Sequence, residues 1–311
     1  MNSGLWAVDC SKITIQDCIF NYYRIQGVGI RCFAIPIISE NYKIINNYFG
    51  YKDNYDPLDT SGGIVGLELI FGTSGGIVYG NHLTNNKHEN CYPYWGWNGT
   101  YPNKYPKTLN PAPINPHAVP DQGDGAGIEL SGYYSTPIPG SVLPENHIII
   151  SNNYADKNQV GIRTEQNSQN TTIVGNTTTN NIMYGIFIYS SCKTICNSNI
   201  ITKNGRSGIS IQDAPNQILP TNIQIISNRI EGMLTNDNGL EIRASEGCII
   251  TNNLFQDCVT GVALYTNSSG NYCKNMIINS NIYNNVTNDF FSDPLSTNST
   301  ILNSGNLSYV V

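Results

Sequence analysis

Two glutamates and two arginines occupy equivalent positions in a short segment that the chain repeats. The segment reads Gly, a branched aliphatic residue, any residue, and usually a second aliphatic residue; its third position holds Arg31, Glu68, Glu129 and Arg163 in successive copies. Two carboxyl groups placed side by side push their pKa values apart, and one rises toward the range of a general acid. A carboxyl separation of ~5–5.5 Å is also typical of a retaining glycoside hydrolase. The pattern therefore indicates acid–base chemistry on a saccharide.

Within this arrangement we predict Glu129 as the acid/base and Glu68 as the second carboxylate. Arg31 and Arg163 would hold anionic or hydroxyl groups of the substrate. Glu165 lies two residues beyond Arg163, so in an extended strand it faces the same side. A plainer interpretation stays open, in which these charges form a ladder that neutralises itself on a sheet surface, where each ion pair contributes only ~0–1 kcal/mol.

The elements that position these residues follow from a second repeat, which is anchored by asparagine. Alternating apolar and polar residues surround that asparagine in residues 146–154, 170–178, 193–201, 222–230, 247–255 and 275–283. The anchoring residues are Asn153, Asn176, Asn199, Asn228, Asn253 and Asn281, spaced 23–29 residues apart. Self-similarity at a period of 20–50 residues is the signature of a solenoid.

The alternation indicates which solenoid this is. Its period of two and its β-branched residues predict short half-buried strands, and no unit carries a helical period. Such units describe the coils of a parallel β-helix, in which successive coils pair at ~4.8 Å and aliphatic residues stack into a continuous core. The asparagines then occupy a bend between strands, where the residue tolerates left-handed backbone angles and its amide can bond the next coil. We assign them a structural role only.

These repeats resemble the parallel β-helix repeats of the pectate-lyase-like superfamily, which includes the carbohydrate-binding and sugar-hydrolase repeat group. The resemblance implies an all-β fold: a single-stranded right-handed parallel β-helix of about ten coils in one domain, residues 1–311. Three parts depart from the repeat: an insertion at 87–124, a second loop at 131–145, and an end at 284–311 that we expect to be irregular. Since such folds host many functions, the resemblance does not select a reaction.

The long insertion carries residues suited to a sugar. Loops of this length are usually functional or disordered. Its first half is rich in aromatic residues with polar edges, among them Tyr94, Trp95, Trp97 and Tyr101. In the resembled superfamily, substrate clefts form where long turns flank this kind of strand. The alternative is a loop that packs its rings onto the sheet to cover it.

The second half of the insertion carries His117, Asp121 and Asp124 directly into the strand of Glu129. We predict Asp124 as a further catalytic residue, and His117 and Asp121 as substrate ligands together with Glu165. The sequence around His117 lacks the complete motif of alginate epimerases, because Asn115 replaces an aspartate. Pectate lyase signatures and the paired aspartates of polygalacturonases are absent as well.

Composition narrows the setting. Charged residues are 12% of the chain and the net charge is −6, against a typical charged fraction of about 25%. Without a basic run, nucleic acid is not an expected partner, and no apolar stretch reaches the ~20 residues of a membrane span. Low charge and the expected fold favour a secreted or cell-surface protein. The nine cysteines do not settle the compartment. Glycosylation sequons occur at Asn98, Asn170, Asn267, Asn285 and Asn298.

We predict no cofactor. Asp53, Asp56 and Asp59 have a spacing that suits calcium, but the glycine and distal glutamate of an EF-hand loop are missing, so an acidic turn is the favoured interpretation. The leading functional hypothesis is an extracellular polysaccharide-active enzyme, a glycoside hydrolase or lyase, whose partner is a glycan. Two alternatives stay open: a structural or adhesive filament subunit that polymerises through uncapped coil ends, and a glycan-binding module without catalysis.

Overall fold

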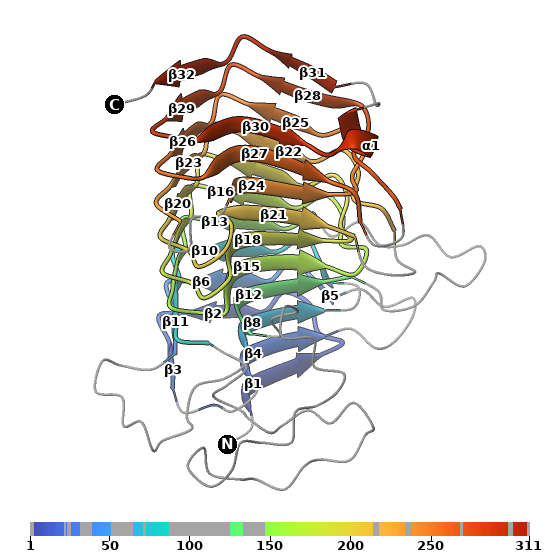
Figure 1. Cartoon of the computed structure of the whole chain (residues 1–311). Helices are drawn as coiled ribbons and strands as arrows, with labels where there is room; N and C mark the ends of the chain where they lie inside the picture. Colours follow the sequence, from blue (N-terminus) through green and yellow to red (C-terminus); the bar gives the residue numbers. More distant parts are fainter. Residues whose placement is uncertain are drawn as a thin grey trace, which may run out of the picture.

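The chain winds into a stack of coils walled by three parallel sheets. The computed structural model describes residues 3–21, 23, 26–31, 39–50, 65–70, 73–86, 125–132, 147–213, 218–233, 238–267, 270–297 and 301–309. Each sheet has ten strands, and each inner strand pairs with its equivalents in the coils before and after it. In Figure 1 the coils rise in sequence order, so the two chain ends lie at opposite ends of the stack. The predicted parallel β-helix of about ten coils is confirmed.

The first sheet carries the Gly-aliphatic-x-aliphatic segments. Its strands are β1 (Ser3–Val8), β4 (Gln26–Arg31), β8 (Val65–Ile70), β12 (Ala126–Ser131), β15 (Val160–Glu165), β18 (Tyr184–Tyr189), β21 (Ile209–Gln212), β24 (Asn238–Arg243), β27 (Thr260–Tyr265) and β30 (Asn288–Ser292).

The second and third sheets lie on either side of the asparagine bend. The second comprises β2 (Thr14–Gln16), β6 (Lys43–Ile45), β10 (Ile77–Tyr79), β13 (Ile149–Ser151), β16 (Thr172–Val174), β19 (Ile195–Asn197), β22 (Gln224–Ile226), β25 (Ile249–Thr251), β28 (Met276–Asn279) and β31 (Ile301–Ser304). The third comprises β3 (Ile19–Phe20), β7 (Tyr48–Phe49), β11 (His82–Thr84), β14 (Tyr154–Asp156), β17 (Thr177–Thr179), β20 (Ile200–Thr202), β23 (Arg229–Glu231), β26 (Leu254–Gln256), β29 (Ile282–Asn284) and β32 (Leu307–Tyr309). Two minor elements complete the described structure: the pair β5 (Ser39–Glu40) with β9 (Thr73–Ser74), and helix α1 (Pro294–Thr297).

Aliphatic side chains from all three walls fill the interior. In the first sheet, Leu67, Ile128, Ile162 and Ile186 stand opposite one another on successive strands, and each is fully buried. Because equivalent positions of every coil stack in register, the core runs the length of the solenoid. The polar residues that alternate with this column therefore project from the opposite, outer face of the first sheet.

The anchoring asparagines form a hydrogen-bonded ladder between the second and third sheets. Asn153 donates its backbone N–H and its side-chain amide to Oδ1 of Asn176, at 2.9 and 3.0 Å. The same amide reaches back to the carbonyl of Val78 in the coil below, at 3.0 Å. Asn176 repeats these contacts with Asn199. The amide-to-amide bonding predicted from the sequence is confirmed.

The predicted backbone conformation of these asparagines is wrong by one residue. The left-handed position is the residue before each ladder asparagine, such as Asn152 (φ 53°), Ser198 (φ 55°) or Asn252 (φ 58°). This preceding residue turns the chain, and the ladder asparagine that follows points its amide inward to bond the neighbouring coils. Two adjacent positions thus divide the roles that the sequence pattern assigned to one.

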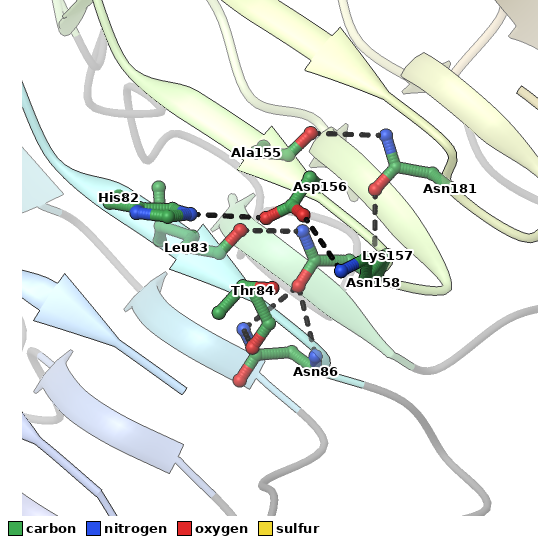
Figure 2. Close-up of polar contacts among 9 residues, drawn as sticks. All are labelled: His82, Leu83, Thr84, Asn86, Ala155, Asp156, Lys157, Asn158 and Asn181. Atoms are coloured by element: carbon green, nitrogen blue, oxygen red, sulfur yellow. Dashed lines mark hydrogen bonds and ion pairs between the residues drawn. The ribbon is translucent and has the colours of Figure 1, made fainter. Parts of the chain in front are cut away.

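A second, shorter asparagine ladder lies at the corner between the third and first sheets (Figure 2). Asn86, Asn158, Asn181 and Asn204 each follow a residue of the first ladder by five positions. Asn158 accepts from the backbone N–H and the amide of Asn86, both at 2.9 Å, and donates its own amide to the carbonyl of Leu83 at 2.9 Å. Further along the stack, Met233, Cys258 and Val286 take over this corner and join the core.

The expectation of an irregular end at 284–311 is wrong for the residues that the structure describes there. Strand β30 extends the first sheet, and β31 and β32 extend the second and third. Asn306 continues the first ladder by accepting from the backbone N–H of Asn281 at 2.9 Å. Gly305 and Asn306 repeat the Gly-Asn pair of earlier coils, and that signal was overlooked. Ser131, placed at the start of the predicted second loop, instead ends β12.

Candidate functional site

Glu68 and Glu129 are immediate neighbours on the outer face of the first sheet. Glu68 of β8 stands opposite Glu129 of β12, and Glu129 stands opposite Arg163 of β15. Neighbouring strands of a sheet lie ~4.8 Å apart. The predicted order of these three charged residues in adjacent coils is therefore confirmed. Glu165 stands two positions further along β15, opposite Ser131, on the same face.

Arg31 belongs to the same cluster, but its predicted register is wrong. Opposite Glu68 in β4 stands Gly29, whereas Arg31 stands opposite Ile70. The segment that matches the repeat is Gly-Val-Gly-Ile at 27–30, and a period of two cannot distinguish its two glycines. Arg31 nevertheless reaches Glu68, with Nη2 at 2.8 Å from Oε2 and 3.0 Å from Oε1.

Glycine at position 29 makes room for two neighbouring side chains. A Cβ atom there would come within 1.9 Å of Gln26 Nε2 and 2.9 Å of Trp6 Cδ1. With its amide oriented to satisfy both neighbours, Gln26 donates to Glu68 and accepts from the Trp6 indole N–H at 3.1 Å. The Arg31 guanidinium lies over the Trp6 ring, 4.6 Å from its centroid. Trp6 and Gln26 thus join the site, which the sequence did not predict.

The remaining charges pair across adjacent strands. Arg163 Nη2 lies 2.7 Å from Glu129 Oε2, and Arg163 Nε lies 3.3 Å from Glu165 Oε2. Each of the two central carboxylates therefore has an arginine partner, Arg31 for Glu68 and Arg163 for Glu129. These two pairs are the ones that the ladder interpretation predicts. Glu165 adds a third carboxylate, so the set carries three negative and two positive formal charges when all five groups are ionised.

These side chains are much less exposed than their outward orientation predicts. Only 13% of the Glu68 side chain, 9% of Glu129 and 8% of Arg163 is accessible. These charged side chains therefore project from the outer face of the sheet but are largely shielded from solvent. A period of two tells which face of a sheet a residue occupies, but it does not tell what lies over that face. Burial strengthens every charge interaction in the cluster, because the screening by water is reduced.

The rise in pKa that two stacked carboxyl groups should show falls on Glu68. Burial and the neighbouring Glu129 charge raise the pKa of Glu68 to about 7, although the arginine charges of Arg31 and Arg163 oppose the rise. A carboxyl group with this pKa is partly protonated at neutral pH and can donate a proton. The proton-donating role predicted for Glu129 from the sequence is thus better matched by Glu68.

The aromatic insertion cannot be placed against this cluster. Outside the described residues lie its predicted substrate ligands Tyr94, Trp95, Trp97, Tyr101, His117 and Asp121, and the further catalytic residue Asp124. The three aspartates considered for calcium, Asp53, Asp56 and Asp59, and the sequons at Asn98 and Asn298 lie outside them as well. Within the described ranges no three His, Cys, Asp or Glu residues gather as they would around a metal ion. The same ranges contain no helix of the length and apolarity that crossing a membrane requires.

Three of the five predicted sequons lie on the described surface. Asn285 is exposed and donates its amide to Asp257 Oδ1 at 2.7 Å, while Asn170 and Asn267 are half-buried. Asn176, whose sequence also fits a sequon, is fully buried in the first ladder. Its amide nitrogen donates to Ile150 and Asn199, and a glycan there would break the ladder. Glycosylation at the three surface asparagines stays a prediction.

A separate polar group lies on the third sheet (Figure 2). His82 Nε2 lies 3.1 Å from Asp156 Oδ1, and the rings of Tyr48 and Tyr154 meet His82 edge-on, each at 5.0 Å. Although burial raises the pKa of Asp156, hydrogen bonds from His82 and Thr84 bring it below its usual range. His82 therefore lies between tyrosine rings of the two neighbouring coils.

Three parallel sheets stacked around one continuous core define a parallel β-helix protein. A family model described as "Right handed beta helix region" matches residues 123–272 and 167–307, which together are more than half of the chain. The chain belongs to this family. No curated protein matches the sequence.

Solved structures with the same fold include enzymes of polysaccharides. A double mutant of the periplasmic alginate epimerase AlgG aligns at 13% identity over 99% of this chain and 71% of that chain, with a TM-score of 0.57. The A-module of Azotobacter vinelandii mannuronan C-5 epimerase AlgE6 aligns at 11% identity over 98% and 75%, with a TM-score of 0.55. The enzymatically active domain of bacteriophage CBA120 tailspike protein 2 aligns at 12% identity over 96% and 39%, with a TM-score of 0.54. At these identities the likeness concerns the fold.

Proposed function

We propose that this protein is a polysaccharide-active enzyme whose reaction takes place at Glu68 and Glu129 on the outer face of the first sheet. The observation that carries the proposal is the raised pKa of Glu68 beside a carboxylate that an arginine holds at 2.7 Å. Two carboxyl groups with different environments can divide the roles of acid and base between them. Similar folds in an alginate epimerase and in an enzymatically active tailspike domain support the choice of a glycan substrate.

In this mechanism Glu68 holds the proton and Glu129 remains a carboxylate. For hydrolysis, Glu68 protonates the leaving glycosidic oxygen while Glu129 acts on the opposite side of the bond, as nucleophile or through a water. For elimination, Glu129 removes a proton from carbon and Glu68 protonates the departing oxygen. In both cases Arg163 stabilises the Glu129 carboxylate, and Arg31 has the same relation to Glu68 once that group has lost its proton.

The arginines also tune the pair. The Arg31 and Arg163 charges lower the pKa of Glu68 from the value that burial alone would produce, and a group near pH 7 is the most effective general acid at neutral pH. Substrate would meet the cluster along its outer edge, where Arg31 retains 19% of its side-chain surface and Trp6 is 53% exposed. Secretion or display at a cell surface would bring such an enzyme to its substrate.

The test is a panel of acidic and neutral polysaccharides incubated with the purified chain. Release of reducing ends without a new ultraviolet absorbance would identify a hydrolase, and absorbance from unsaturated products would identify a lyase. Glu68→Gln and Glu129→Gln should each abolish the signal while the thermal unfolding midpoint changes little. Binding without turnover by the wild-type chain would contradict the enzyme and support a glycan-binding module.

A further inference from the structure

Another glutamate on the same outer face holds an arginine in place. Glu241 of β24 continues the column of Glu129 and is 5% exposed. Its Oε2 accepts from Ser207 Oγ at 3.1 Å, and its Oε1 accepts from Arg243 Nε and from Gln212 Nε2 at 3.5 Å. A buried carboxylate with several donors is a fixed anchor, because each bond restricts its rotation. The guanidinium bonded to it is therefore fixed as well.

The opposite edge of this guanidinium is open. About 44% of the Arg243 side chain is accessible. Within the described ranges its polar contact is through Nε to Glu241, and no bond from its terminal nitrogens is found there. The guanidinium lies over the Tyr265 ring, 5.5 Å from its centroid. Arginine in such a setting offers a planar pair of donors that suits a carboxylate or sulfate group.

Aromatic rings continue beyond the arginine. Tyr265 of β27 and Phe291 of β30 lie with their centroids 5.4 Å apart, and Phe291 is 43% exposed. Flat rings with exposed faces suit the apolar face of a sugar ring, and they lose little conformational entropy on binding. Arg243 and these two rings thus combine a fixed cation with an apolar surface at one end of the sheet.

The distance from the glutamate pair decides what can occupy both places. Successive positions of the column lead from Glu129 through β15, β18 and β21 to Glu241 in β24. Four strand spacings of ~4.8 Å amount to roughly 19 Å. A monosaccharide cannot reach both sites, but a glycan chain along the solenoid axis can, because one sugar residue is about as long as one strand spacing.

We propose that Arg243, Tyr265 and Phe291 form a distal subsite that binds an acidic substituent of a glycan chain about four sugar residues away from the glutamate pair. The subsite rests on the proposed function in one respect, that the glycan lies on this face. It makes binding depend on chain length, since only oligomers of about five residues or more span both sites. It also makes binding depend on charge, since the open edge of Arg243 has no matching group on a neutral sugar.

The test is calorimetric titration of the full chain with mannuronate oligomers from dimer to octamer. Maltooligosaccharides of the same lengths serve as neutral probes and chondroitin sulfate oligomers as sulfated ones. We expect affinity to rise sharply once the acidic oligomers reach about five residues, and Arg243→Gln to lower the affinity for long oligomers about tenfold, as loss of a charge-assisted bidentate contact should. Short oligomers should bind both proteins alike. A response to chondroitin sulfate alone would assign the substituent as sulfate, because these oligomers carry sulfate besides carboxylate. A response to both acidic series would assign it as carboxylate.

Arg229→Gln is the matched control, because Arg229 also pairs with a glutamate two residues away in the same strand but lies on the third sheet. Arg243→Lys separates charge from shape and should recover only part of the affinity. Equal binding by wild type and Arg243→Gln, equal loss in Arg229→Gln, or equal binding of maltooligosaccharides would each overturn the subsite. Turnover that depends on Glu129 but not on Arg243 would support the proposed enzyme and reject the subsite. Binding that depends on Arg243, without any turnover, would support the subsite and reject the proposed enzyme.

Discussion

The two glutamate clusters on the outer face of the first sheet use similar residues in different ways. Glu68 and Glu129 stack directly, so each carboxyl group feels a second negative charge at close range. Glu241 instead stands between Ser210 and Ala263, and no second carboxyl group adjoins it in its column. The difference teaches that a column position alone does not make a reactive group. Burial, together with a second carboxyl group in the next coil, moves the pKa of Glu68 into the neutral range.

The arginines differ in the same sense. Arg163 is buried and contacts two carboxylates, so its charge is compensated inside the cluster. Arg243 is half exposed, and its contact with Glu241 orients it toward solvent. One cluster is therefore organised for chemistry and the other for holding a ligand, and substitutions in the two should have different consequences.

The largest expected effect is on kcat, which should fall when the glutamate pair is changed but not when Glu241 is changed. Glu129→Gln and Glu68→Gln should each lower kcat by at least about 10²-fold, because each removes a group that transfers or accepts a proton. Glu241→Gln should raise KM for long acidic substrates and leave kcat nearly unchanged, since it loosens Arg243 only. Steady-state kinetics on an active glycan measures both parameters. Glu231→Gln, on the third sheet, should change neither, and a loss of kcat in that control would show that the assay does not report on the site.

The next effect concerns stability. Arg163→Leu leaves Glu129 and Glu165 buried without their partner and should cost about 3–5 kcal/mol of unfolding free energy. Arg243→Leu should cost less, because Glu241 keeps its contacts with Ser207 and Gln212 and the lost arginine is half exposed. Urea denaturation followed by circular dichroism compares the two midpoints. Equal losses would mean that the two arginines are held in equivalent surroundings, which contradicts the comparison.

A pH profile tests the raised pKa of Glu68. The folded chain binds this proton up to about pH 7, whereas the carboxyl group of the unfolded chain releases it near 4.5. The folded state thus holds more protons between these values, so this group makes stability fall as pH rises from about 4.5 to 7. Glu68→Gln should remove that downward contribution, while Glu241→Gln should keep it. The measurement is the unfolding midpoint as a function of pH across this range. Identical slopes of midpoint against pH in wild type and Glu68→Gln would contradict the raised pKa.

The parts that sequence analysis captured are those that depend on repetition. The spacing of the asparagines and the period of two were enough for the β-helix and for the adjacency of Glu68 and Glu129, because stacking in register follows from the repeat itself. The register of Arg31 was missed because two glycines, Gly27 and Gly29, fit the pattern equally well. The choice of Glu68 as the proton donor could not be made, since its pKa depends on burial, and alternation does not report what covers a face.

The asparagine corners give the smallest effect and test the same idea, that neighbours in the adjacent coils set the role of a repeated residue. Asn199 lies inside the first ladder and bonds to Asn176 on one side and Asn228 on the other. Asn204, in the same coil, ends the second ladder: it accepts from Asn181 and has apolar Met233 at the equivalent position of the next coil. A ladder residue inside a run thus serves two neighbours, whereas a terminal one serves a single neighbour.

Replacing either asparagine by methionine leaves buried amide groups without partners, at about 1–3 kcal/mol for each site. Asn199→Met should cost more than Asn204→Met, because it also removes a donor to Asn228 and interrupts a run that continues on both sides. The methionine at position 204 instead meets Met233, as apolar residues already do at that corner. Thermal and urea unfolding of the two variants, made singly in the same background, give the order. If Asn204→Met proved the more damaging, hydrogen bonding within the ladder would not be what distinguishes the two corners, and the stacking of like residues would have to be explained by packing alone.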